Sequence, residues 1–112
     1  MVVDAVPNET KLRNYLNELK SRKPNTKFRL VHILVEMGKG WHSFKAIRES
    51  GAGCGVSVSH LLDNLLELCR KSDFLESDFR EKYYPRLSSF RIINARLPLL
   101  RKIFQEFDKE EV

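Results

Sequence analysis

The chain of 112 residues has few of the features that mark secreted, membrane-spanning or disulfide-rich proteins. It has only two cysteines, Cys54 and Cys69, which is too few for a disulfide framework and favours a reducing compartment. Its apolar runs are only a few residues long, so we expect no bilayer-spanning segment. The first ten residues, MVVDAVPNET, lack the basic start and long apolar middle of a secretion signal. These absences together predict a cytoplasmic protein.

Motifs for catalysis, nucleotide binding and metal binding are also missing. The glycine-rich stretch GAGCG lacks the G-x-x-x-x-G-K-[ST] pattern and follows no hydrophobic strand, so it predicts a flexible turn between two helices. Cys54, His60 and Cys69 raise the question of zinc, but there is no C-x-x-C pair, and two thiols without a metal are expected. No nucleophile or acid–base set can be assembled, so we expect neither an enzyme nor a cofactor.

The composition is that of a soluble globular protein with a modest basic excess. Apolar residues make up 42% and charged residues 31%, and the net charge is +5. Residues 1–56 contain ten lysines and arginines against five acids, whereas residues 57–112 contain ten of each. Such an excess suits contact with a polyanion, although many cytosolic proteins share it. By length we expect one domain over residues 10–107, a flexible lead-in over 1–9 and an acidic tail over 108–112.

The clearest local pattern is an amphipathic helix from Ser57 to Lys71. At about 100° per residue, one half of the helical circle carries only apolar side chains: Val58, Leu61, Leu62, Leu65, Leu66, Leu68 and Cys69. The other half carries only polar and charged side chains, which we expect to face outward. Ser57 is the expected N-cap, and the basic residues at the end suit the helix dipole.

Weaker patterns predict the remaining elements. In chain order they are a helix over 10–22, a largely apolar and therefore central helix over 26–37, a short helix over 43–50, strands over 74–79 and 89–94, and a final helix over 95–107. Thr10, Ser43 and Asn94 are the expected helix caps. His32 lies four residues before Glu36, which predicts a surface pair more than a functional histidine.

This order resembles the winged helix-turn-helix fold of small prokaryotic transcription regulators of the ArsR and MarR kind. The stretch GVSVSHLLDNLLELCRKSDFLES resembles the turn, recognition helix and first wing strand of that family, and FRIINARLPLLRKIF resembles its second wing strand and C-terminal helix. The resemblance implies a mainly α fold with a small β-hairpin, with four to five helices plus a two- or three-stranded wing. The chain departs from the family in its long, glycine-rich turn and in Asp63 and Glu67, two acids on the presented face that phosphates would repel.

The resemblance implies that the helix over 57–71 enters the major groove of DNA. The side chains expected to contact DNA from this helix are Ser57, Ser59, His60, Asn64 and Lys71. The wing loop over 80–88 would bring Arg80, Lys82, Tyr84 and Arg86 to phosphates or the minor groove, and the start of the preceding helix would bring Lys39, His42 and Lys45 to backbone phosphates. Asp63 could accept a hydrogen bond from a cytosine amino group or be a solvated surface acid.

We therefore expect sequence-specific binding of double-stranded DNA and transcriptional regulation, with no effector ligand identified. The apolar stripes of the two terminal helices further predict a homodimer that presents two recognition helices. Its expected interface residues are Leu12, Leu16, Leu19, Leu100, Phe104 and Phe107. The alternative is a winged-helix protein–protein interaction module without DNA binding, which the acids at 63 and 67 and the neutral C-terminal half favour.

Overall fold

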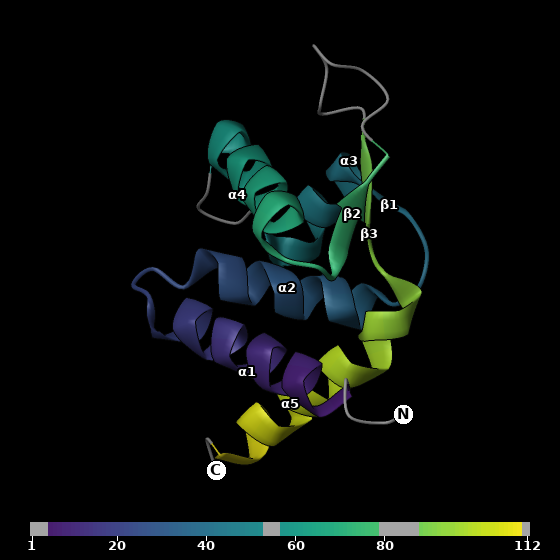
Figure 1. The fold of residues 1–112 in the computed structure, drawn as a ribbon. Coiled ribbons are helices and arrows are strands. Elements are labelled where there is room, and N and C mark those ends of the chain that lie inside the picture. The colour runs from purple at the N-terminus through teal and green to yellow at the C-terminus, as the bar shows by residue number, and fades with distance from the viewer. Residues whose placement is uncertain (1–4, 53–56, 79–87, 111–112) are drawn as a thin grey trace.

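A computed structural model describes residues 5–52, 57–78 and 88–110 of the chain (Figure 1). The α-helices in these ranges are α1 (Ala5–Ser21), α2 (Thr26–Met37), α3 (Phe44–Ile47), α4 (Val58–Lys71) and α5 (Leu97–Glu110), and a π-helical turn, Arg48–Ala52, follows α3. The strands are β1 (His42–Ser43), β2 (Leu75–Ser77) and β3 (Ser89–Ile92). The predicted mainly α architecture with a small antiparallel sheet is therefore confirmed. Within the described residues, no helix is both long and apolar enough to cross a membrane.

Helix α2 is the centre of the fold, as its broad apolar surface predicts. Leu30, Val31 and Leu34 are almost fully buried, and the helix has the predicted bounds. Figure 1 shows α2 between two layers, with α4 and the sheet on one side and α1 and α5 on the other. Gly38 and Gly40 follow it with φ angles of 87° and 98°, a region that favours glycine, so the chain turns sharply into β1.

The three strands form one antiparallel sheet in the order β1-β3-β2. β3 pairs with both neighbours: Phe90 lies opposite His42 of β1, and Ile92 lies opposite Leu75 of β2. The two predicted strands exist but are shorter than the ranges 74–79 and 89–94. β1 was not predicted, because two residues are too short for a periodic pattern and its pairing depends on β3, far along the chain.

Both terminal helices differ from their predicted ranges. α1 begins at Ala5, so residues 5–9 are helical rather than a lead-in, and Thr10 lies inside the helix instead of capping it. Pro7 is tolerated in this first turn, where a backbone N–H has no helical acceptor. A 3₁₀ turn, Asn94–Arg96, precedes α5, which continues to Glu110 and so includes part of the predicted acidic tail.

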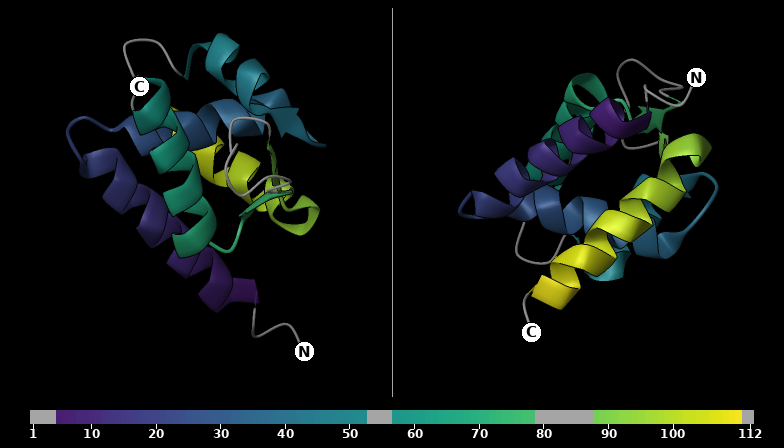
Figure 2. Two further views of the ribbon diagram at one scale, coloured as in Figure 1. Left: turned by 90° about the horizontal axis from the view of Figure 1, so that it is seen from above. Right: turned by 60° about the horizontal axis from the view of Figure 1, so that its bottom comes forward.

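The residues predicted to form a dimer interface lie in the core of the single chain. Leu12, Leu16, Leu19, Leu100, Phe104 and Phe107 are each at most 6% exposed. Figure 2 shows why: α1 and α5 cross the same side of α2. The ring of Phe28 on α2 lies 5.2 Å from Phe104 and 5.9 Å from Phe107, measured between ring centroids. The assignment of these side chains to a dimer interface is therefore corrected to core packing.

Ion pairs join the outer sides of α1 and α5. Lys102 Nζ lies 3.0 Å from Glu9 Oε1, and Arg13 Nη1 lies 2.5 Å from Glu106 Oε2. Arg13 also reaches Glu9 at 3.3 Å, so Glu9 joins two cations. These cations lower the pKa of Glu9, the Lys102 hydrogen bond most of all. These contacts with α5 help to explain why α1 begins before Thr10, which the local sequence of α1 does not predict.

Candidate functional site

The polar face of α4 is the candidate site, and local sequence explains why this helix forms. Ser57 caps it as predicted: its Oγ accepts a hydrogen bond from the backbone N–H of His60 at 3.2 Å. Leu61, Leu65 and Leu68 are fully buried on the opposite face. Burial of a leucine side chain contributes about 1.5–3 kcal/mol, so these three residues anchor the helix and fix its rotation.

The polar half of α4 faces solvent, as predicted. Ser57, Ser59, His60, Asp63 and Lys71 are exposed, and Asn64 is half-buried. Donors and acceptors of these six side chains are therefore accessible to an external partner. In Figure 1 the N-terminal end of α4 and the hairpin ends of β2 and β3 point to the same side of the molecule, away from α1 and α5.

Glu67, one of the two acids on this face, is held by two lysines. Its carboxylate forms an ion pair with Lys27 of α2, and Lys71 Nζ lies 3.3 Å from its Oε1. The pKa of Lys27 is lowered, first by partial burial and then by repulsion from Arg22 and Lys71. The negative charge of Glu67 is therefore offset within the protein, whereas no ion pair of Asp63 occurs among the described residues.

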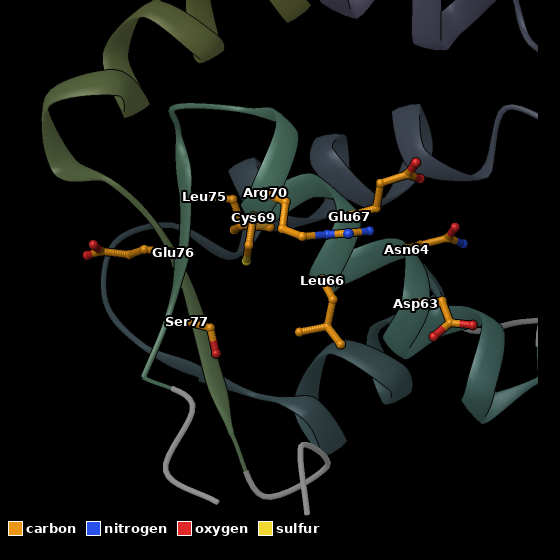
Figure 3. A pocket seen from close by; sticks show the side chains of 9 residues that line it. All are labelled: Asp63, Asn64, Leu66, Glu67, Cys69, Arg70, Leu75, Glu76 and Ser77. Carbon is orange, nitrogen blue, oxygen red and sulfur yellow. The ribbon is translucent and has the colours of Figure 1, made fainter. Parts of the chain in front are cut away.

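A hollow of about 900 Å³ lies between α4 and β2 (Figure 3). Leu66, Cys69 and Ser77 point into this space, while Asp63 and Asn64 point away from β2. Burial raises the pKa of the Cys69 thiol to about 11, and the nearby Glu76 adds to the shift. The thiol is therefore protonated at neutral pH, which disfavours both nucleophilic attack and metal binding.

The three residues predicted to touch phosphate around this point lie in the turn after α2 (Lys39), on β1 (His42) and in α3 (Lys45). Lys39 and Lys45 are exposed. His42 is half-buried on β1, and its Nε2 lies 3.0 Å from the carbonyl oxygen of Gly38. Ser43 caps α3 as predicted, because its Oγ accepts from the backbone N–H of Ala46 at 3.1 Å. The two lysines remain available to an anion, whereas one nitrogen of the His42 ring already has a partner.

The predicted wing residues Arg80, Lys82, Tyr84 and Arg86 lie outside the described residues, as does Cys54. The base of the hairpin is described. The backbone N–H of Ser89 donates to Oδ1 of Asp78 at 2.7 Å, and the backbone N–H of Asp78 donates to the carbonyl of Ser89 at 3.1 Å. β2 and β3 are therefore joined as far as Asp78 and Ser89.

Other predicted polar residues have structural partners. His32 Nε2 lies 3.2 Å from Glu36 Oε1, as the spacing predicts, and the imidazole also stacks on Phe104 with 4.7 Å between ring centroids. Within ranges 5–52, 57–78 and 88–110, no group of three or more His, Cys, Asp or Glu side chains could hold a metal ion.

Two features could not be found from the sequence: one ion pair of the candidate site and the surroundings of Trp41. Lys27 lies on α2, four residues before Val31. Nothing near Lys27 in the sequence indicates its pairing with Glu67, because Glu67 belongs to a different helix, α4. Trp41 precedes β1, and its ring is covered on one side by the guanidinium of Arg91 at 4.5 Å. For the contact of Trp41 with Arg91, the sequence showed only an isolated tryptophan next to a glycine turn.

No family model matches the chain, and no curated protein or solved structure matches it. The function must therefore be argued from the chemistry and geometry of the chain itself.

Proposed function

We propose that this chain is a winged-helix protein that binds double-stranded DNA with sequence preference and regulates transcription. One observation carries the proposal: α4 buries its leucines and leaves Ser59, His60 and Asp63 exposed, with Asn64 half-exposed. A helix of 14 residues is about 21 Å long, and the major groove is wide enough to admit it. Serine, histidine and asparagine side chains can form hydrogen bonds with base edges.

The arrangement of the neighbouring elements supports this assignment. α2, α3, α4, β2 and β3 follow one another in the order that the resemblance to winged-helix regulators implies, and the strands pair as β1-β3-β2. The end of the hairpin and the start of α4 lie on one side of the molecule, so a duplex could contact both. The pairing of Glu67 with Lys27 and Lys71 also reduces the repulsion that an acid on this face would cause.

In this function the lysines and arginines supply affinity, and α4 supplies selectivity. Lys39 and Lys45 would neutralise phosphates, together with the basic residues of the loop over 80–88. Asn64 is suited to paired hydrogen bonds with adenine, and His60 can donate to guanine. The proposed partner is therefore a duplex with a preferred sequence, and pairing of two copies would double the site without using the core leucines.

Selection of bound fragments from a random duplex pool, followed by binding titrations, tests the proposal. We expect an enriched sequence and a logarithm of the association constant that falls by about 0.9 per neutralised phosphate against the logarithm of salt concentration. Asn64→Ala should cost about 1–3 kcal/mol on the selected sequence and little on random duplexes. Asn17→Ala, an exposed asparagine on α1, is the matched control.

A protein-interaction module with the same fold is the second candidate. The hollow between α4 and β2 favours it, because Leu66 and Leu75 line that space and Asp63 adds an acid that DNA would repel. Such a module should give no shift of any duplex, even at low salt. That result would refute DNA binding and leave the interaction module as the assignment.

A further inference from the structure

Trp41 is exceptional among the apolar side chains of this protein. It is the only tryptophan of the chain, and 45% of its surface is exposed, whereas every residue of the core cluster is at most 6% exposed. Within the described residues it is the one exposed large hydrophobic side chain. It lies between the glycine turn after α2 and strand β1, so its backbone position is fixed by two ordered neighbours.

One face of the Trp41 ring is covered by a positioned guanidinium. The Cζ atom of Arg91 lies 4.5 Å from the ring centroid. Phe90 and Ile92 point into the core, so Arg91 between them projects from the outer face of the sheet. Glu76 is its register partner on β2 and forms an ion pair with its Nε. Glu76, Arg91 and Trp41 therefore form a row across the outer face, and this row holds the indole ring in place.

Glu76 offsets the charge of Arg91, so the cations near the ring that favour an anionic partner are Lys39 and Lys45. Lys39 and Lys45 are two and four residues from Trp41, which limits their Cα atoms to about 14 Å from it by chain length. Both are exposed, and neither has an ion pair within the described part of the chain. The segment over 38–48, GKGWHSFKAIR, contains no acid. A partly exposed aromatic ring with cations nearby in the chain is the kind of arrangement that binds single nucleic-acid strands, because bases stack on the ring and phosphates meet the cations.

We propose that the surface formed by Trp41, Arg91, Lys39 and Lys45 binds an unpaired nucleic-acid strand, with one base stacked on the exposed part of the Trp41 ring. A paired base cannot do this, since its faces are already stacked within the duplex. β1 lies at the opposite edge of the sheet from β2, the strand beside α4. The surface is therefore separate from the polar face of α4. Lys39 and Lys45 are also the lysines proposed to meet duplex phosphates, so Trp41 and Arg91 distinguish this surface, and the inference does not rest on the proposed function.

The sole tryptophan makes the test direct, because emission excited at a wavelength that the three tyrosines do not absorb reports on Trp41 alone. We expect an oligothymidylate to quench this emission in a saturable titration, and we expect added salt to reverse the quenching. Unchanged emission at low salt would overturn the proposal. Equal quenching by polyglutamate would also overturn it, because the surface would then respond to negative charge and not to bases.

Variants test the ring and the cations separately, with a fluorescein-labelled oligothymidylate as the probe. Trp41→Ala should weaken binding by about 5- to 100-fold, because one stacked base is lost. Trp41→Phe should weaken binding less, and it serves as the second variant if the alanine protein does not fold. Lys45→Gln should weaken binding several-fold, whereas Lys109→Gln, an exposed lysine of α5, should have no effect.

Equal losses from Lys45→Gln and Lys109→Gln would overturn the proposal, since binding would then depend only on net charge. Asn64→Ala on α4 should leave oligothymidylate binding unchanged. Loss of duplex recognition in that variant, with strand binding retained, would separate this surface from the proposed function. Duplex binding by the chain without quenching of Trp41 emission by oligothymidylate would overturn this inference and leave the proposed function standing.

Discussion

Substitution of Glu67 by glutamine tests the electrostatics of α4 most directly. The carboxylate lies between Lys27 and Lys71, so the two ammonium groups interact with Glu67 instead of with an external anion. Glutamine keeps the size of the side chain and removes its charge. If the polar face of α4 meets phosphates, this change should release two cations toward DNA and remove one repulsive charge.

The expected magnitudes follow from the exposure of the three side chains. Glu67 is 26% exposed, Lys27 18% and Lys71 63%, so solvent weakens the pair with Lys71 more than the pair with Lys27. Partly exposed ion pairs contribute about 0–1 kcal/mol each, and we expect the unfolding free energy to fall by at most about 1–2 kcal/mol. One charge a few ångströms from a phosphate is worth about 1 kcal/mol in water, so duplex affinity should rise roughly fivefold.

Fluorescence anisotropy of a labelled duplex at several salt concentrations measures the effect. Each newly engaged lysine should add about 0.9 to the slope of the logarithm of affinity against the logarithm of salt concentration. Glu36→Gln is the control, because Glu36 is exposed on α2 and pairs only with His32 among the described residues. Weaker binding by Glu67→Gln, or an unchanged slope with equal effects of both variants, would refute the reasoning.

Three further predictions concern stability and the thiol. Leu65→Ala should lower the unfolding free energy by about 2–5 kcal/mol in urea titrations, and more than Leu62→Ala, because Leu65 is fully buried and Leu62 only partly. The pKa of Glu9 is lowered from 4.5, so its ion pairs stabilise the fold above that pH and the stabilisation is lost as pH falls through the folded-state pKa. The stability gap between wild type and Glu9→Gln should therefore close on acidification; a gap that widens would contradict the pairing. In a Cys54→Ser protein, alkylation of Cys69 should be slow at pH 8 and rise toward pH 11; a midpoint near 9 would contradict its burial.

Local patterns predicted part of the fold well. Helix α2 has the predicted bounds, and α4 follows its predicted cap, Ser57, because capping and the 3.6-residue period act within a single helix. Ser43 caps α3 for the same reason. The strands were found by their composition but extended too far, since the end of a strand depends on where its partner ends. The start of α1 was missed, because part of its support comes from ion pairs with α5.

In the candidate site, too, some features could be predicted from local patterns and others could not. The polar face of α4 could be predicted, because the period places its serines, His60 and Asn64 opposite the leucines. The pairing of Glu67 with Lys27 and the stack of Arg91 on Trp41 could not, because each joins elements far apart in the chain. The exposure of Trp41 also had no local signal, since a tryptophan beside a glycine turn can be buried or exposed according to what packs over it.

Local sequence patterns were sufficient to predict where the main helices form and which faces of α4 are polar and apolar. Both follow from interactions within a few residues, which any chain with that sequence would make. Only the tertiary structure decided that the leucines and phenylalanines of α1 and α5 belong to one core. An apolar stripe must be covered, but whether α2 or a second chain covers it depends on how the helices pack. The same packing places β1 beside β3 and thereby brings Trp41 to Arg91 on the outer face of the sheet.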